Sequence, residues 1–220
     1  MTNLLITRHG ESEHNLTTHV YMGRAPTSRL TEKGRDQAER LGRRLAQSHR
    51  LDHIVCSSLP RTQETAQAIA QSYAQQVLTA PNGQASQDQS PMLPPIYPED
   101  AFWELSKGDW EGRMPRNLPP DIRQQLDRDP FGFRYPGGES YGDVWERIAP
   151  AFDGWLTRLG EGTVLFVLHG DVMRALWYHL IRFPKEKIED FDTEPCALNQ
   201  FRWHNGRTVV VKLNDTSHLV

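Results

Sequence analysis

Residues 4–14 of the chain read LLITRHGESEH, in which an apolar run ends in an Arg-His pair followed by a glycine. A short aliphatic run of this kind predicts a buried β-strand that delivers Arg8 and His9 to the edge of a sheet. Gly10 permits a sharp turn without a Cβ clash, and we expect main-chain N–H groups of this turn to face a ligand. The stretch therefore predicts a site that grips and attacks an anion.

A second stretch repeats this design. Residues 163–170 read TVLFVLHG, the most apolar strand candidate in the chain, and they end in His169-Gly170. In an open α/β sheet, ligands bind outside the carboxyl ends of the strands. Two strands that both end in His-Gly therefore predict that His9 and His169 serve one site.

Strand and helix patterns alternate along the chain. Strands are predicted at residues 4–7, 53–56 and 163–168, with a hairpin formed by residues 197–203 and 208–213 around Asn205-Gly206. Helices are predicted at residues 31–48, 60–76, 121–127, 140–159 and 171–182. The alternation predicts an α/β fold, a three-layer αβα sandwich with a mostly parallel central sheet. We expect one domain, residues 1–220, with a flexible surface loop at the Gln-, Ser- and Gly-rich residues 79–98.

Composition excludes several classes of protein. The formal net charge of −3 disfavours a general role in binding nucleic acid or a membrane surface, because both need an excess of basic residues. We find neither a signal-peptide pattern nor an apolar stretch long enough to span a bilayer, so a cytoplasmic location is expected. Two cysteines, Cys56 and Cys196, are too few for a disulfide scaffold.

The residue types at these strand ends suit phosphoryl transfer. Arg8 and Arg61 supply forked donors that match the geometry of a phosphate group. An unprotonated histidine between them can attack phosphorus, and neighbouring cations lower its pKa and so favour that state. A second histidine, His169, can stabilise charge on the phosphoryl oxygens. Glu104 lies in an aromatic segment, where burial would keep it protonated for donation to the leaving group.

Other uses of these residues find less support. His9 and His14 are five positions apart, and no HExxH or CxxC pattern occurs, so we expect no metal and no other cofactor. The phosphate-binding motif GxxxxGK[ST] is also absent. The remaining histidines have no comparable context and receive no role: His14, His19, His49, His53, His179, His204 and His218.

Four separated motifs, in order along nearly the whole chain, resemble the histidine phosphatase superfamily, which includes the phosphoglycerate mutases. They are TRHGESEHN at residues 7–15, LTEKG at residues 30–34, SSLPRTQETA at residues 57–66 and HG at residues 169–170. The resemblance implies that His9 is the phosphorylated nucleophile and that Glu104 is the proton donor that later activates water. It implies that Arg8, Asn15, Arg61 and His169 line the phosphate pocket. The family uses no metal.

Two further stretches resemble particular branches of this family. ELSKGDWEG at residues 104–112 resembles the phosphatase branch rather than the cofactor-dependent mutases, which carry Glu-Arg-His-Tyr-Gly there. RYPGGESY at residues 134–141 and HGDVMR at residues 169–174 resemble the fructose-2,6-bisphosphatase group. In that group, residues at the positions of Tyr141 and Arg174 hold a second phosphate. Gly170 departs from the usual Gln, and Pro130 lies near the position of a usual lysine. Gly23 and Gly170 complete the expected substrate-binding residues.

Three functions remain open at this stage. The leading one is a metal-independent phosphatase that hydrolyses small phosphomonoesters, sugar phosphates or bisphosphates, through a phosphohistidine. The second is phosphoryl transfer of the cofactor-dependent phosphoglycerate mutase type, and the third is a non-catalytic module that binds a phosphorylated ligand. The expected partner is a small phosphorylated metabolite, with no nucleic acid and no membrane. The oligomeric state is open, and a homodimer is one state that the sequence allows.

Overall fold

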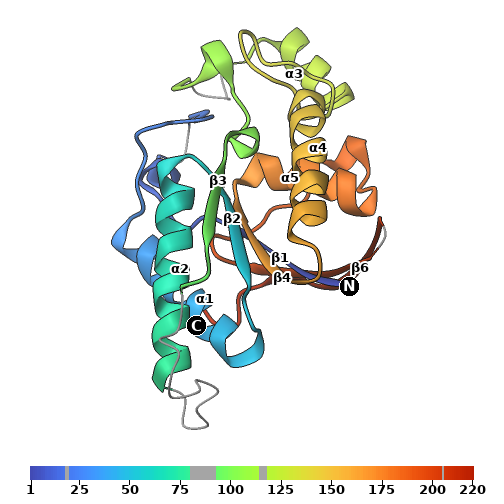
Figure 1. Ribbon diagram of the computed structural model, residues 1–220. Helices are drawn as coiled ribbons and strands as arrows, with labels where there is room; N and C mark the ends of the chain where they lie inside the picture. The colour runs from blue at the N-terminus through green and yellow to red at the C-terminus, as the bar shows by residue number, and fades with distance from the viewer. Residues whose placement is uncertain (18–19, 80–92, 114–117, 205) are drawn as a thin grey trace.

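The computed structural model describes residues 1–17, 20–79, 93–113, 118–204 and 206–220 (Figure 1). Six strands form one sheet in the order β3-β2-β4-β1-β5-β6. The strands are β1 (Thr2–Arg8), β2 (His53–Ser57), β3 (Ile96–Glu99), β4 (Gly162–Leu168), β5 (Leu198–His204) and β6 (Arg207–Asp215). The first four run parallel, and the β5–β6 hairpin adds to β1 in the antiparallel direction. The prediction of a mostly parallel sheet is confirmed.

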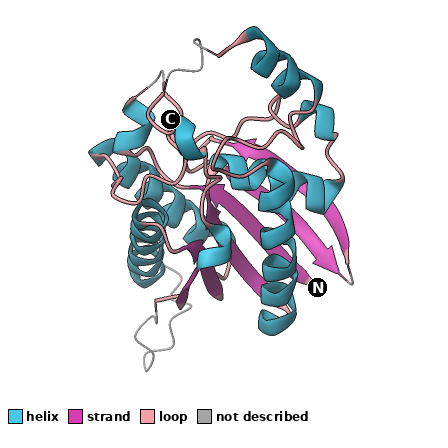
Figure 2. Cartoon of the chain, turned by 90° about the horizontal axis from the view of Figure 1, so that it is seen from above, coloured by secondary structure: helices cyan, strands magenta, loops and turns pink. Residues whose placement is uncertain are grey.

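Helices cover both faces of this sheet (Figures 1 and 2). One face carries α1 (Glu32–Ser48) and α2 (Pro60–Thr79), and the other carries α4 (Tyr141–Leu159) and α5 (Gly170–Ile181). The short α3 (Pro120–Arg128) lies beyond the strands, at the top of Figure 1. This arrangement is the predicted three-layer sandwich, and no described helix has the length and apolar character needed to cross a membrane.

Alternating side chains of β1 explain why two separate cores form. Leu4 and Ile6 point to the face that α4 and α5 cover, and Leu5 points to the face that α1 and α2 cover. All three are fully buried, as expected for a strand with helices on both sides. The apolar run at residues 4–6 therefore belongs to a central strand, β1, which lies between β4 and β5.

The helix starts follow the sequence signals. The Thr31 side chain accepts a hydrogen bond from the Gly34 N–H (3.0 Å) at the start of α1. Ser140 and Asp143 form a reciprocal capping box at the start of α4. The five predicted helices are confirmed to within a few residues at each end.

The prediction of a loop over residues 79–98 is wrong at its end. Ile96–Glu99 forms β3, an edge strand that pairs with β2 alone. Pro98 cannot donate a ladder hydrogen bond, and a proline is tolerated in a strand only at such an edge. Residues 80–92 of the predicted loop lie outside the described residues, as does Asn205 of the predicted hairpin turn.

Candidate active site

Strand register brings the two histidines together. β1 and β4 are parallel neighbours in which Arg8 pairs with Leu168, so the next residue of each strand is a histidine. The His9 N–H donates to the Leu168 carbonyl (2.9 Å), and the two imidazole centroids lie 5.3 Å apart. The two His-Gly strand ends therefore meet at one edge of the sheet, as the sequence predicts.

The hydrogen bonds of His9 define which nitrogen can attack. Nδ1 lies 2.8 Å from the Gly10 carbonyl, to which it can only donate, so the ring proton belongs on Nδ1. Nε2 then accepts a hydrogen bond from Arg61 Nε (3.2 Å). Burial, followed by the charges of Arg61 and Arg8, holds the pKa of His9 well below its ordinary value of 6.5. The ring is neutral at neutral pH, with its lone pair on Nε2.

Arg61 is held in place by main-chain oxygens. It is the second residue of α2 and only 1% exposed, and its Nη1 donates to the carbonyls of Arg24 (2.9 Å) and Ala25 (3.2 Å). Burial lowers its pKa to about 10, which leaves the guanidinium charged at neutral pH. No described carboxylate forms a salt bridge with Arg61, so its charge is available to an anion.

Buried polar atoms without partners surround the same point. Arg8 Nε and both ring nitrogens of His169 are buried and have no hydrogen-bond partner among the described residues. A buried donor left without an acceptor destabilises a fold by ~1–3 kcal/mol, so such groups call for a polar ligand. Gly170 begins α5 here, so the positive end of that helix adds to the same field.

The turn after His9 differs from the expectation. Three successive N–H groups donate to side chains instead of facing a ligand: Gly10 to Thr65 Oγ1 (3.1 Å), Glu11 to Gln37 Oε1 (2.9 Å) and Ser12 to Asn15 Oδ1 (2.9 Å). The prediction of a main-chain anion nest is therefore wrong. A glycine is required at position 10 because a Cβ there would collide with the carbonyl of Gly34.

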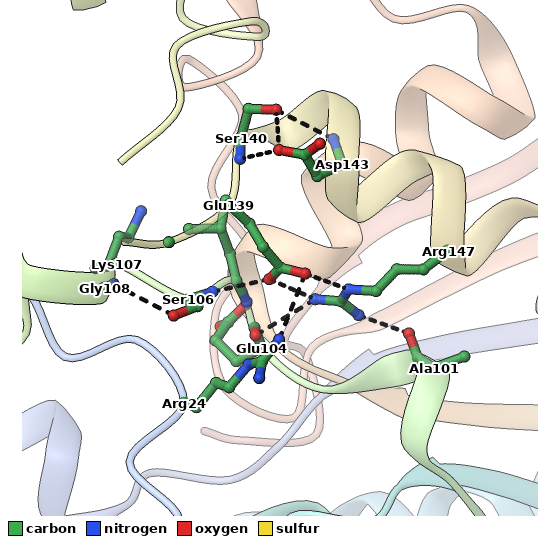
Figure 3. A network of polar contacts seen from close by, with 12 residues as sticks. Arg24, Ala101, Glu104, Ser106, Lys107, Gly108, Glu139, Ser140, Asp143 and Arg147 are labelled. Atoms are coloured by element: carbon green, nitrogen blue, oxygen red, sulfur yellow. Dashed lines mark hydrogen bonds and ion pairs between the residues drawn. The ribbon is translucent and has the colours of Figure 1, made fainter. Parts of the chain in front are cut away.

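Glu104 lies on a segment that contacts Arg147 of α4 (Figure 3). Arg147 of α4 donates to the carbonyls of Ala101 (2.6 Å) and Glu104 (3.4 Å). It also forms a two-point ion pair with Glu139, whose carboxylate accepts from the Ser106 N–H (3.0 Å). One arginine thus fixes the backbone on both sides of the candidate proton donor.

The Glu104 carboxyl has the environment that a proton donor requires. Burial, followed by the nearby carboxylate of Asp171, raises its pKa above the ordinary 4.5, and the charges of Arg61 and Lys107 oppose this. Its Oε1 accepts a hydrogen bond from the Leu105 N–H (2.9 Å). A carboxyl with a raised pKa can carry a proton at a pH where an exposed glutamate cannot.

A cavity of about 550 Å³ opens next to this group. The predicted site residues in its wall are Arg8, Asn15, Gly23, Glu104, Tyr141, Gly170 and Arg174. His9 follows Arg8 and His169 precedes Gly170 in the chain, and Arg61 donates to His9; all three are buried, with at most 3% of their surface exposed. The structure therefore brings all ten predicted site residues close together.

Several wall residues were not selected from the sequence. Lys107, Tyr135 and Asp171 line the far part of the cavity. His14, for which no role is predicted, also lies in the wall. Burial, followed by the charges of Arg61 and Arg8, lowers the pKa of His14 to about 4. The one signal in the sequence for Lys107 is its position three residues after Glu104.

Asp171 is the centre of a polar cluster at this far end. Its Oδ1 accepts from Tyr141 Oη (2.7 Å) and Arg174 Nη1 (2.8 Å), and its Oδ2 lies 3.0 Å from Lys107 Nζ. Lys107 also donates to Tyr135 Oη (3.1 Å) and lies 4.3 Å above the centre of that ring. Lys107 and Arg174 together hold the pKa of the Asp171 carboxyl well below its usual range, although burial acts against them.

The described residues contain no group of three or more histidine, cysteine or acidic side chains arranged to hold a metal ion. The side chains described above suit nucleophilic attack by a neutral imidazole, charge stabilisation by two arginines, and proton transfer by a carboxyl group.

Comparison with known proteins assigns the chain to a family. The family model of the histidine phosphatase superfamily (branch 1) matches residues 4–82 and 84–216. The chain belongs to this superfamily, as its motifs predict.

Individual relatives match over the full chain. Phosphoserine phosphatase 1 of Hydrogenobacter thermophilus is 29% identical over 223 residues, which cover 100% of this chain and 95% of the relative. The probable phosphoglycerate mutase GpmB of Yersinia enterocolitica is 28% identical over 227 residues, with the same coverage of both chains. The solved structure of YhfR from Bacillus stearothermophilus superposes with a TM-score of 0.80 at 29% identity and covers 100% of both chains.

Proposed function

We propose that this protein is a metal-independent phosphatase that hydrolyses small phosphomonoesters through a phosphohistidine on His9. The observation that carries the proposal is the His9 ring, whose unprotonated Nε2 lies 3.2 Å from Arg61 Nε beside the buried, unpartnered donors of Arg8 and His169. An uncharged nucleophile among fixed cations suits attack on a phosphate dianion. The name of the Hydrogenobacter relative supports the same class of reaction.

In the first half of the reaction, His9 Nε2 attacks phosphorus and the bond from phosphorus to the ester oxygen breaks. The electron pair of that bond goes to the leaving oxygen, which takes a proton from Glu104. Arg8, Arg61 and His169 stabilise the phosphoryl oxygens, where charge accumulates in the transition state. The raised pKa of Glu104 supports this assignment, since only the protonated carboxyl can serve as the acid.

In the second half, the Glu104 carboxylate takes a proton from water, and the water oxygen attacks phosphorus. The bond between phosphorus and Nε2 breaks, its electron pair returns to His9, and inorganic phosphate leaves. The cavity beside the site, about 550 Å³ in volume, is large enough for a small metabolite and then for water.

The test is to trap the intermediate. Brief incubation with a ³²P-labelled phosphomonoester followed by denaturation should leave acid-labile label on His9, and His9→Ala should lose both the label and ~10⁴-fold or more in phosphate release. His179→Ala is the matched control, because that histidine pairs with Asp153 on the outer side of α5. Full activity of His9→Ala would overturn the proposal.

A mutase is the second candidate, because the Yersinia relative carries that name. A mutase must keep the phosphoryl group on His9 until it is returned to an acceptor, so it needs a bisphosphorylated cofactor and releases little phosphate. Measurement of free phosphate with and without such a cofactor separates the two functions. Binding of phosphorylated ligands without any turnover would indicate the non-catalytic module instead.

Several expectations from the sequence stay predictions. They are sugar phosphates or bisphosphates as substrates, a cytoplasmic location, the absence of nucleic-acid or membrane partners, and a homodimer. Phosphoserine joins the sugar phosphates as a compound to test, on the strength of one relative's name. A panel of phosphorylated sugars, acids and amino acids, scored by phosphate release, tests the substrate class directly.

A further inference from the structure

The far end of the cavity has an unusual charge balance for a site that would hold a second phosphate. Arg174 and Lys107 are the cations best placed for such a group, and both contact the same carboxylate, Asp171, at 2.8 Å and 3.0 Å. Tyr141, the other residue expected to hold a second phosphate, donates its hydroxyl to Asp171 as well (2.7 Å). The donors that a second phosphate would need are therefore already used by a carboxylate of this chain.

Asp171 is built into the fold at this position. It is the second residue of α5, directly after Gly170, and both its oxygens are occupied. Lys107 is only 7% exposed and lies among the rings of Tyr21, Tyr135 and Tyr141. The hydrogen bonds and the packing hold both ion pairs closed, since separating a buried pair leaves a charge unpaired at a cost of ~3–5 kcal/mol.

Further acidic side chains line the same end. Besides Asp171, the described wall residues include Asp127, Glu189 and Asp192, against the three cations Lys107, Arg123 and Arg174. Asp192 lies between Arg174 (3.8 Å) and Arg8 (3.7 Å). Burial raises the pKa of Glu189, the charges of Lys107 and Arg174 oppose this, and the carboxylates of Asp171 and Asp127 add to it. Four acidic side chains thus face three cations, so this end has no surplus of positive charge for a second phosphate.

We infer that the substrate carries a single phosphate, and that the rest of the molecule has no net negative charge. A hydroxyl-bearing or zwitterionic group fits a wall that offers both donors and acceptors, whereas a second phosphate meets the carboxylate of Asp171. Asp171 is the residue that sets this preference. This inference rests on the proposed function for the place of the first phosphate, and it replaces the expectation that Tyr141 and Arg174 bind a second one.

Three compounds on one carbon skeleton provide the test. Phosphoserine, 3-phosphoglycerate and 2,3-bisphosphoglycerate share a phosphate at one end and a carboxylate at the other. They differ only in an ammonium, a hydroxyl or a phosphate group at the middle carbon. Dissociation constants are measured by titration calorimetry with His9→Ala, which removes the nucleophile and so prevents turnover. We expect affinity to fall in the order given, with about tenfold or more between the first and the last.

The variant Asp171→Asn in the same background tests whether Asp171 causes the preference for a single phosphate. It keeps the size of the side chain and removes the charge, so Lys107 and Arg174 become available to an anion. The preference for phosphoserine over 2,3-bisphosphoglycerate should shrink by about tenfold or reverse. Asp153→Asn, an equal change at a carboxylate that pairs with His179 on the outside of α5, should leave the order unchanged.

The outcomes separate this inference from the proposed function. Equal or tighter binding of 2,3-bisphosphoglycerate by His9→Ala, or binding by none of the three compounds, overturns the inference, and so does a folded Asp171→Asn variant with the original order. If Asp171→Asn does not fold, the order of the three affinities decides alone. Absence of phosphate release by the unaltered protein overturns the proposed function and leaves the order of affinities valid.

Discussion

The two ends of the cavity contain similar cations that are held in different ways. At the end next to His9, Arg61 donates to the carbonyls of Arg24 and Ala25. Arg8 donates to the carbonyl of Thr193 (2.9 Å) and lies 3.7 Å from the exposed carboxylate of Asp192. At the far end, Lys107 and Arg174 each contact the carboxylate of Asp171. Arg61 is thus anchored by carbonyl dipoles, whereas Lys107 and Arg174 are anchored by a full negative charge.

The difference shows how one cavity can be selective for a single phosphate. A carbonyl oxygen orients a guanidinium and leaves its net charge in place, whereas a carboxylate at about 3 Å largely cancels that charge. The end next to His9 therefore favours a dianion, and the far end favours a group that forms hydrogen bonds without bringing charge. The two ends therefore differ in the groups that bind their cations and not in the number of cations.

The largest expected effect contrasts an arginine from each end. Arg61→Gln removes a donor to His9 Nε2 and an uncancelled charge, so kcat/KM for a monophosphate should fall by ~10²–10³-fold. Arg174→Gln removes a charge that Asp171 already cancels, and the loss should stay below about tenfold. Steady-state rates of phosphate release measure both. Equal losses in the two variants would show that the ends do not differ as described.

Glu104 tests whether the proton donor acts where its position suggests. Glu104→Gln cannot protonate the leaving oxygen, so hydrolysis of an alkyl phosphate should slow by ~10²-fold or more. With p-nitrophenyl phosphate, whose leaving group needs no proton, the release of p-nitrophenol in the first turnover should slow far less. Rapid-mixing measurement of that burst gives the comparison. An equal loss for both compounds would assign Glu104 to binding rather than to proton transfer.

The sequence predicts the His9 end better than the far end, for a physical reason. The apolar run before His9 and the one before His169 each contain a complete strand signal, and parallel pairing of the two strands then places the histidines together. The contact of Lys107 with Asp171 joins residues that are 64 positions apart and depends on how the segment after Glu104 folds back. No local sequence pattern predicts that contact.

Two other misses have the same origin. The N–H groups after His9 are used by Thr65 and Gln37, side chains of two different helices, so the expected anion nest fails for a tertiary reason. β3 has only four residues and includes Pro98, which makes its propensity weak, and it forms because β2 offers a free edge. Local signals thus predict the central strands, and packing determines the edges and the polar partners.

The pH profile offers a way to compare the ends through their effect on catalysis. Activity needs a neutral His9 and a protonated Glu104. The pKa of His9 is lowered from 6.5 by burial, Arg61 and Arg8, and that of Glu104 is raised from 4.5 by burial and Asp171. The required state therefore extends to lower pH than an ordinary histidine allows and to higher pH than an ordinary glutamate allows.

Variants from the two ends should move opposite limbs of this profile. Asp171→Asn removes a charge that raises the pKa of Glu104, so the basic limb of kcat should move to lower pH. On that limb the rate falls about tenfold for each pH unit by which the pKa of Glu104 drops. Arg61→Gln removes a charge that lowers the pKa of His9, so the acid limb should move to higher pH. If both variants moved the same limb, the assignment of acid and nucleophile to these two residues would be wrong.

The smallest expected effect concerns Arg147, which fixes the backbone of the segment that carries Glu104. Arg147→Met keeps the stem of the side chain in its place on α4 and removes the donors to Ala101 O, Glu104 O and Glu139. Each hydrogen bond that fixes the Glu104 backbone contributes ~1 kcal/mol, so kcat should fall severalfold as the carboxyl is less well placed, with KM little changed. Because Arg147 touches no reacting atom, the loss should be greater for alkyl phosphates than for p-nitrophenyl phosphate, as for Glu104→Gln but weaker. Arg158→Met, on the same helix and over the ring of Trp155, is the control. A loss independent of the leaving group would mean that Arg147 supports the fold in general rather than the placement of the proton donor.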